Sequence, residues 1–402
     1  MFDKDRFAAL STHNAPGQEV RQATGNVGNL MRGNILPGQL VDFSHGDVDA
    51  FLPTPGAVEC FSAAVDAGGR QAYTEYRGSA DIRSELAERL AAFTGAPVSA
   101  EDGTIVTPGT QGALFLAVAS LVNPGDKVAI VQPDYFANRK LVQFFGGEAI
   151  PVAMSYLEAS PEAGIDLSQL RAAFEAGARI FLFSNPNNPT GAVYSRREIE
   201  KIIALALTFE VTVIADQLYS RLLYEGETYT HIRACGLPED RSITIMGPSK
   251  TESLSGYRLG IAFGAPSIVE RMEKLQAIVS LRAPGYNQAV LRTWFNEPVG
   301  WLDERIQQHQ AIRDDLLSIF RSGGLATRTP QAGSYLFPTL PPLAVGLHDF
   351  VRLLRHQASA IVTPGTEFGP HSHSIRLNFS QDRAAAIAAG RRIVELVHRY
   401  RA

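Results

Sequence analysis

One lysine stands between two apolar runs of this 402-residue chain. Lys250 lies in the segment Gly247-Pro248-Ser249-Lys250-Thr251-Glu252, and Arg258 precedes the second apolar run. A charged amine between two buried strands is costly unless it is neutral, paired with an acid or covalently bound. A lysine amine can form an imine with a carbonyl compound, which is a common route to covalent catalysis. A solvated loop lysine is the alternative, and this segment alone leaves both interpretations open.

Other candidate residues also come directly after short apolar runs. These residues are Gly109, Tyr135, Asn188 and Asp216. Ligands of parallel sheets bind at the carboxyl ends of the strands, so we expect these side chains to gather near Lys250. The glycine-rich turn at 108–112 also presents free backbone N–H groups at a helix start, which suits a phosphate. A tight turn that merely needs small residues would have the same sequence.

The elements that must position these residues are short apolar strands alternating with helices. Strands are predicted at 104–107, 128–131, 179–183, 211–215, 242–246 and 259–263, and helices at 57–67, 79–93, 113–121, 168–175, 195–209 and 267–281. Ser195 and Glu198 have the spacing of a capping box that opens one of these helices. Such apolar strands predict an α/β fold with a mostly parallel sheet buried on both faces.

The pattern changes in the last third of the chain. Long amphipathic helices are expected over about 287–321, short strands at 335–337, 361–362 and 375–379, and helices at 350–357 and 384–400. We expect a large domain at 46–284. A smaller α+β domain would combine 285–402 with an irregular N-terminal arm, residues 1–45.

The composition is that of an ordinary globular enzyme. Hydrophobic residues make up 45% and charged residues 19%, and the net charge of −4 gives no reason to expect a nucleic-acid surface. No apolar run approaches the ~20 residues of a membrane span, and Met1–Arg6 is more charged than a signal peptide. Neither Cys60 and Cys235 nor His371 and His373 have metal-site spacing. We therefore expect a cytoplasmic protein without a metal.

Three segments, in this order, resemble the fold-type I, pyridoxal-phosphate-dependent class I/II aminotransferase family. They are Ser184–Gly191, which ends in Asn-Asn-Pro-Thr-Gly, then Asp216-Gln217-Leu218-Tyr219, then Ser249-Lys250 with Arg258 downstream. The resemblance extends from about residue 40 to 380. It implies a large domain with a seven-stranded, mostly parallel sheet between helices, a smaller α+β domain, and pyridoxal 5′-phosphate as cofactor.

The resemblance also implies roles around the cofactor ring. Lys250 matches the lysine that holds the cofactor as a Schiff base and later moves the substrate proton. Asp216 matches the carboxylate that pairs with the pyridine nitrogen, and a protonated nitrogen makes the ring an electron sink. Asn188 and Tyr219 match the pair that hydrogen-bonds the ring oxygen O3′, and Tyr135 has the place of the stacking aromatic ring.

A further set of residues matches the phosphate-binding groups of the family. Gly109, Thr110 and Gln111 resemble the turn that cradles the phosphate, and Ser249 and Arg258 resemble its other ligands. Arginine suits this role because its guanidinium can give two parallel hydrogen bonds to phosphate oxygens.

The remaining matches concern the substrate and the partner subunit. Arg376 matches the arginine that binds the substrate α-carboxylate, alongside Asn188, and Gly46 matches a backbone contact that closes the substrate pocket. Tyr73 matches a tyrosine that reaches the phosphate of the neighbouring subunit, which implies a homodimer with shared active sites.

Three features depart from the family pattern or leave a residue's role open. Gly247 stands where many relatives have a serine, so one phosphate hydrogen bond is lost or replaced. His45 and Asp47 lie in an altered loop, either as substrate contacts or as polar side chains that cap their own loop. Arg282 could reach across a dimer and favour a dicarboxylate, or it could be a surface arginine.

The leading functional hypothesis is amino-group transfer between an L-amino acid and a 2-oxo acid. The alternative is a pyridoxal-phosphate-dependent lyase, cyclase or oxidase that uses the same Lys250. A non-catalytic regulatory protein on this fold usually carries an added DNA-binding domain, and no basic segment of that size precedes residue 40. Arg376 indicates an α-carboxylate, but no residue identifies the substrate side chain.

Overall fold

A seven-stranded sheet is the largest feature of the fold. The computed structural model describes residues 7, 10, 17–23, 27–46, 49–157 and 162–402. The strand order is β2-β8-β7-β6-β5-β3-β4, with β8 antiparallel to both neighbours and the other neighbouring pairs parallel. The strands are β2 (Thr104–Pro108), β3 (Lys127–Gln132), β4 (Glu148–Ala153), β5 (Ile180–Ser184), β6 (Thr212–Asp216), β7 (Ser242–Met246) and β8 (Leu259–Gly264).

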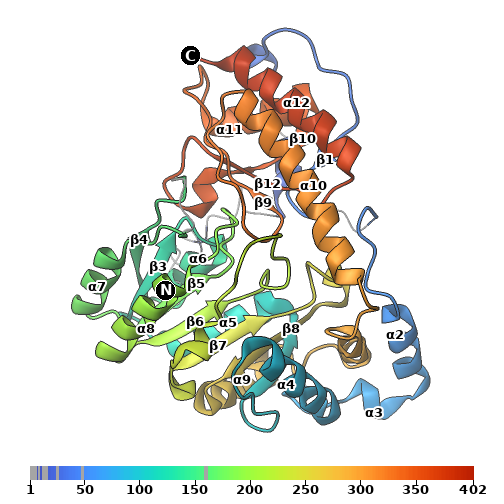
Figure 1. The fold of residues 1–402 in the computed structure, drawn as a ribbon, viewed down its shortest axis with the longest axis vertical. Helices are drawn as coiled ribbons and strands as arrows, with labels where there is room; N and C mark the ends of the chain where they lie inside the picture. The colour runs from blue at the N-terminus through green and yellow to red at the C-terminus, as the bar shows by residue number, and fades with distance from the viewer. Residues whose placement is uncertain (1–6, 8–9, 11–16, 24–26, 47–48, 158–161) are drawn as a thin grey trace.

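Helices cover both faces of this sheet (Figure 1). On β5, Phe181 and Phe183 pack in one buried cluster with α7 and α8, whereas Ile180 and Leu182 pack in another with α5, α6 and α9. This alternation explains why the strand reads as a continuous apolar run. The predicted α/β fold is therefore confirmed. The helices on this side of the molecule are α2 (Ala57–Asp66), α3 (Gly69–Ala72), α4 (Ala80–Thr94), α5 (Gly109–Leu121), α6 (Phe136–Phe144), α7 (Leu167–Glu175), α8 (Arg196–Thr208) and α9 (Pro266–Val279).

The C-terminal elements form a separate layer, in the upper part of Figure 1. Its buried cluster includes Phe43, Leu316, Phe350 and Tyr400. The N-terminal arm joins this layer, because β1 (Val41–Asp42) pairs in parallel with β10 (Ala360–Ile361). The other elements are α10 (Trp301–Ser322), α11 (Leu347–Ala358), α12 (Arg383–Tyr400), β9 (Tyr335–Leu336), β11 (Thr363–Pro364) and β12 (Ile375–Asn378).

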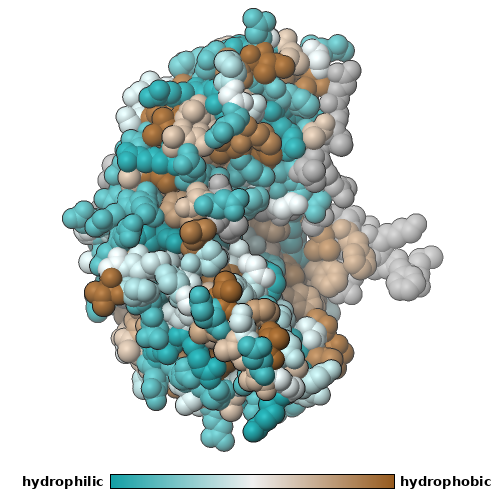
Figure 2. Space-filling model, turned by 90° about the vertical axis from the view of Figure 1, so that its right-hand side faces the viewer, coloured by the Kyte–Doolittle hydropathy of each residue, from teal (hydrophilic) through white to brown (hydrophobic). Residues whose placement is uncertain are grey.

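Short 3-10 helices complete the described elements. They are η1 (Glu19–Ala23), η2 (Gly28–Leu30), η3 (Ile232–Cys235), η4 (Glu239–Arg241), η5 (Ser255–Tyr257), η6 (Tyr286–Thr293) and η7 (Gly365–Phe368). In the described part of the chain, no helix has both the length and the apolar character needed to cross a membrane. The face shown in Figure 2 is mainly hydrophilic, with hydrophobic residues in separate patches.

The structure corrects three sequence predictions. The edge strand β4 was not predicted, because it is largely exposed and contains Pro151. Helix α5 begins at Gly109, four residues before the predicted start. The segment 287–321 is not continuously α-helical, since η6 is a 3-10 helix and Pro298 and Gly300 separate it from α10.

The predicted capping box is confirmed, with an additional role. The Ser195 hydroxyl accepts a hydrogen bond from the Glu198 N–H, and the Glu198 carboxylate accepts one from the Ser195 N–H at 2.8 Å. The same carboxylate accepts the N–H groups of Ala163 and Gly164, both at 2.9 Å. One glutamate therefore starts α8 and also holds the loop before α7.

Candidate active site

A cavity of about 250 Å³ lies at the carboxyl ends of the parallel strands. Strands β2, β3, β5, β6 and β7 each end beside it and supply its residues through the turns that follow. Most of the predicted site residues line it: Thr110, Gln111, Tyr135, Asn188, Asp216, Tyr219, Ser249, Lys250, Arg258 and Arg376. The expectation that the strand ends bring these side chains together is met.

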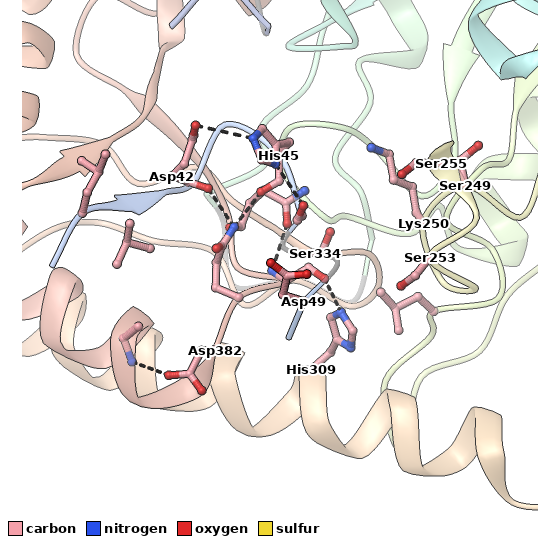
Figure 3. A pocket seen from close by; sticks show the side chains of 18 of the residues that line it. Asp42, His45, Asp49, Ser249, Lys250, Ser253, Ser255, His309, Ser334 and Asp382 are labelled. Atoms are coloured by element: carbon pink, nitrogen blue, oxygen red, sulfur yellow. Dashed lines mark hydrogen bonds and ion pairs between the residues drawn. The ribbon is translucent and has the colours of Figure 1, made fainter. Parts of the chain in front are cut away.

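Lys250 stands where this cavity meets a second one. The second cavity, of about 620 Å³, shares His45, Ser249, Lys250 and Ser255 with the first. In Figure 3 the Lys250 side chain leaves the loop after β7 and extends into the open space toward His45. Gly46 lines the second cavity rather than the first. Lys250 thus lines both spaces.

Asp216 ends β6 and turns its carboxyl group to the cavity. The Leu218 N–H donates to its Oδ1 at 3.1 Å. Burial raises the pKa of Asp216 to about 6, and the Leu218 hydrogen bond opposes that shift. A carboxylate without a cationic partner in the described protein is a ready acceptor for a protonated ring nitrogen.

Arg376, on β12, is buried and reaches the cavity from the C-terminal layer. Its Nη1 donates to Asn188 Oδ1 at 3.3 Å, and its Nη2 donates to the Ser44 carbonyl at 3.0 Å and to Thr363 Oγ1 at 3.4 Å. Its Nε–H is buried without a hydrogen-bond partner in the described structure. An unpaired buried guanidinium N–H is costly, so this donor suits an anionic ligand such as a carboxylate.

The turn from β2 into α5 forms a cationic end of the cavity. Gly109 has a φ of +77°, and a Cβ there would lie 2.6 Å from Arg258 Nη2. A Cβ on Gly260 would lie 2.3 Å from the Thr110 nitrogen. These close approaches place the Arg258 guanidinium beside the first N–H groups of a 13-residue helix, an arrangement that binds phosphate groups.

The structure also explains the glycine at position 247. A Cβ there would lie 2.8 Å from Thr110 Cγ2 and 3.2 Å from the Gly260 Cα. The space that a serine side chain would need is therefore occupied by Thr110. Glycine at 247 therefore makes room for the Thr110 methyl group at this end of the cavity.

Tyr135 is held at the cavity wall by Gln111, a predicted site residue, and by Asp134, which was not predicted. Its hydroxyl donates to Gln111 Oε1 at 2.9 Å, and its N–H donates to Asp134 Oδ1 at 2.6 Å. The buried Asp134 carboxyl also accepts the Ser184 N–H at 2.9 Å and the Ser184 hydroxyl. Burial raises the pKa of Asp134 to about 8.

Three more lining residues had no sequence signal. Tyr335, on β9, contacts both Arg376 and Tyr219. Gly17 shows that the N-terminal arm reaches the cavity, and Ser44 supplies its carbonyl to Arg376. From sequence alone, a site tyrosine in a short strand cannot be told from a core tyrosine. A glycine of the arm and a main-chain carbonyl likewise give no sign that they line a cavity.

Two other predicted residues, Tyr73 and Arg282, do not line this cavity, whereas His45 lies where it meets the second one. Tyr73 is 79% exposed on a loop, where its ring lies 5.3 Å from the Arg282 guanidinium. Arg282 also donates to the Thr74 carbonyl. His45 Nε2 lies 3.5 Å from Asp42 Oδ2, and the hydrogen bond to Asp42 is the main reason that the pKa of His45 rises to about 9. Asp47 lies outside the described residues.

No metal centre is present among the described residues, where no group of three or more His, Cys, Asp or Glu side chains could hold an ion. His371 is instead enclosed by Tyr156 and Phe337, and burial lowers its pKa.

The family model for aminotransferase class I and II matches residues 39–391. The chain belongs to this family. The match includes every residue that the resemblance placed around the cofactor and the substrate, and these include four that line one cavity: Lys250, Asp216, Asn188 and Arg376. This aminotransferase uses pyridoxal phosphate and moves an amino group between an L-amino acid and a 2-oxo acid. Nothing observed favours elimination, ring closure or oxidation instead.

Relatives of the aminotransferase carry several substrate names. A crystal structure of an aspartate aminotransferase from Rhodobacter sphaeroides is 62% identical, covers 99% of this chain and 100% of that one, and has a TM-score of 0.95. The aspartate/prephenate aminotransferase of Thermus thermophilus is 29% identical over 85% of this chain and 86% of its own length. The arginine–pyruvate transaminase of Pseudomonas aeruginosa is 27% identical over 83% of each chain.

The residues present in the aminotransferase fit pyridoxal phosphate. The α5 N-terminus and Arg258 provide donors for a phosphate, and Asp216 provides an acceptor for a ring nitrogen. The unpaired Nε–H of Arg376 remains for a carboxylate. Each of these groups needs the complementary charge that the cofactor or the substrate would bring.

Proposed function

We propose that this aminotransferase takes L-aspartate as an amino donor. The observation that carries the proposal is the 62% identity, over 99% of the chain, to a protein described as an aspartate aminotransferase. More distant relatives have other substrate names, so identity at this level is the stronger guide. The 2-oxo acid that accepts the amino group would bind in the same cavity.

Substrate binding would begin at Arg376. Its free Nε–H and the neighbouring Nη can give two hydrogen bonds to an α-carboxylate, while the Asn188 and Ser44 contacts hold the guanidinium plane. Tyr335 and Phe368 lie against that plane, at 4.5 and 5.0 Å from its central carbon. The aromatic rings exclude water, which strengthens the ion pair.

Proton transfer would be the task of Lys250. When bound, pyridoxal phosphate withdraws electrons from the substrate Cα and so makes its proton removable. The Lys250 amine extends into the cavity from a loop whose next residues, Thr251 and Glu252, are buried. A base on such a fixed support can take the proton from one carbon and return it to another. Asp216 would hold a proton on the ring nitrogen throughout.

We also propose a cytoplasmic homodimer with shared active sites. Large hydrophobic side chains near Tyr73 support the dimer, since Ile278 is 85%, Val279 59% and Leu281 53% exposed. Arg282 links this segment to Tyr73. A surface of this kind usually marks a contact with another chain. In such a dimer, Tyr73 would serve the phosphate site of the partner.

The division into a large domain, 46–284, and a small domain, 1–45 with 285–402, is part of the same proposal. It is supported by the C-terminal buried cluster, which takes in Val41 and Phe43 from the arm. A few residues of that cluster, such as Tyr224, come from the proposed large domain. Arg376 would then belong to the small domain and Lys250 to the large one.

The test uses the purified protein loaded with pyridoxal phosphate. L-Aspartate should bleach the visible band of the bound cofactor, and 2-oxoglutarate should restore it. The variant Lys250→Ala should lack both the band and turnover, whereas Lys201→Ala, on the exposed face of α8, should retain both. If a panel of L-amino acids bleaches the band and aspartate does not, the donor is wrong. If Lys250→Ala behaves like wild type, the site itself is wrong.

A further inference from the structure

Tyr335 contacts two predicted site residues, Arg376 and Tyr219. It lies on β9, next to β12, and its register partner is Asn378, two residues after Arg376. Its side chain lines the cavity between Arg376 and Tyr219. The residue is 5% exposed, so its hydroxyl and its ring both face protein or cavity rather than bulk water.

The ring of Tyr335 supports the carboxylate-binding arginine. The central carbon of the Arg376 guanidinium lies 4.5 Å from the Tyr335 ring centre, and the Phe368 ring lies on it at 5.0 Å. Cation–π contacts of this kind are strongest when they are desolvated, as here. The two rings restrict the guanidinium to the plane in which its free Nε–H is available to a ligand.

The hydroxyl of Tyr335 meets the hydroxyl of Tyr219. Tyr219 Oη donates to Tyr335 Oη at 2.7 Å, and the two rings lie edge to face at 5.3 Å. Burial raises the pKa of Tyr219 well above its ordinary value, so Tyr219 keeps its proton. Burial also acts to raise the pKa of Tyr335, but Arg376, Lys250 and the Tyr219 hydrogen bond together hold it below its ordinary value.

The hydrogen bond between these two hydroxyls can reverse its direction without moving a heavy atom. A tyrosine hydroxyl has one proton and two lone pairs. If the Tyr219 hydroxyl donates its hydrogen bond to the cofactor oxygen O3′ instead, the Tyr219 oxygen can accept a hydrogen bond from the Tyr335 hydroxyl. The hydrogen bonds then run from Tyr335 to Tyr219 to O3′, and each bond in such a chain polarises the next.

We propose that Tyr335 is a positioning residue that joins Arg376 to Tyr219. Its ring fixes the arginine that binds the α-carboxylate, and its hydroxyl directs the Tyr219 proton to the cofactor. The inference rests on the proposed roles of Arg376 and Tyr219. Both roles would then depend on Tyr335, and the effects of its ring and of its hydroxyl can be separated by mutation.

The experiment compares Tyr335→Phe, Tyr335→Leu, Tyr219→Phe and the double variant Tyr219→Phe/Tyr335→Phe, all loaded with pyridoxal phosphate. The first readout is the midpoint of the pH titration of the visible band. The second is KM for the amino donor and for the 2-oxo acid. Tyr400→Phe is the matched control, since it removes a buried hydroxyl, bonded to Gln357 at 2.5 Å, from the C-terminal core. Thermal unfolding checks that each variant is folded.

Tyr335→Phe should raise the titration midpoint by about half a unit to one unit, because a hydrogen bond that stabilises the unprotonated form is weakened. KM should stay within about twofold of wild type, because the ring remains. Tyr335→Leu should shift the midpoint similarly and also raise both KM values about tenfold. In the Tyr219→Phe background, adding Tyr335→Phe should shift the midpoint no further.

The inference is overturned if Tyr335→Phe leaves the midpoint at the wild-type value, or if its shift is as large without the Tyr219 hydroxyl. It is also overturned if Tyr335→Leu does not raise KM. These failures differ from failure of the proposed function, in which the wild-type protein itself would show no visible band or no response to an amino donor.

Discussion

Replacing Arg376 with lysine keeps the positive charge and removes the forked shape of the guanidinium. In the structure Nη2 holds the Ser44 carbonyl at 3.0 Å, Nη1 holds Asn188 at 3.3 Å, and Nε is free. A lysine amine at this buried position cannot serve these acceptors and also give two parallel hydrogen bonds to a carboxylate. The variant therefore loses one charge-assisted hydrogen bond to the substrate.

The loss can be given a magnitude. A hydrogen bond to a charged group contributes about 1.5–3 kcal/mol, and each 1.36 kcal/mol is a factor of ten in rate. We expect kcat/KM to fall about 10- to 100-fold. The fall should be similar for the amino donor and for the 2-oxo acid, because both present an α-carboxylate. The visible band of the bound cofactor should remain, since Arg376 does not lie at the α5 end of the cavity.

Steady-state kinetics with both substrates and a cofactor titration provide the assay. Arg392→Lys is the control, because Arg392 is also a buried arginine that donates to main-chain carbonyls, those of Ala358 and Gln39, but lies outside the cavity. The reasoning is refuted if Arg376→Lys leaves kcat/KM unchanged. It is also refuted if only one of the two substrates is affected, or if Arg392→Lys has the same effect.

Three further predictions concern stability. His45→Gln should lower the free energy of unfolding below about pH 6.5 by no more than about 1 kcal/mol, because the pair is exposed. The difference, followed by thermal unfolding, should vanish as pH rises through about 9, where wild-type His45 loses its proton; a difference that grows with pH would contradict this. Lys140→Met should lower the free energy of unfolding by about 3–5 kcal/mol, because it leaves the Glu367 carboxylate buried without this partner. In thermal unfolding, the double variant Lys140→Met/Glu367→Leu should recover most of that loss, and a double variant as unstable as Lys140→Met would contradict the prediction. Glu198→Ala should cost at least about 2 kcal/mol, measured in the same way, because three backbone N–H groups lose their acceptor; a neutral result would show that water replaces it.

Much of the sheet could be predicted because its strands are buried on both faces. Strands such as β5 and β7 are continuous apolar runs, and their ends were placed to within one residue. The exposed edge strand β4 has no such run, since only Val152 is buried in it. The antiparallel direction of β8 was also not predicted, because side-chain burial is the same for either strand direction.

The site was predictable where chemistry restricts the residue type. A lysine, an aspartate and an arginine in or beside buried segments are costly and therefore conspicuous, as with Lys250, Asp216 and Arg376. Tyr335 and Asp134 were missed for opposite reasons. Tyr335 lies in a short strand where a core tyrosine would look the same, and Asp134 lies in a loop where a solvated aspartate is ordinary. Only the fold brings them to the cavity.

The tight junction between Gly260 and the Gly109–Thr110 turn has a practical consequence for redesign. Backbones this close tolerate no added side chain, so the phosphate end of the cavity forms one rigid piece with the sheet. Arg376 and the Ser44 carbonyl belong to β12 and the turn after β1, which that junction does not include. A mutant library confined to those two segments should therefore change how tightly a substrate carboxylate is bound while cofactor retention is preserved. A library that includes the two glycines would lose the cofactor first.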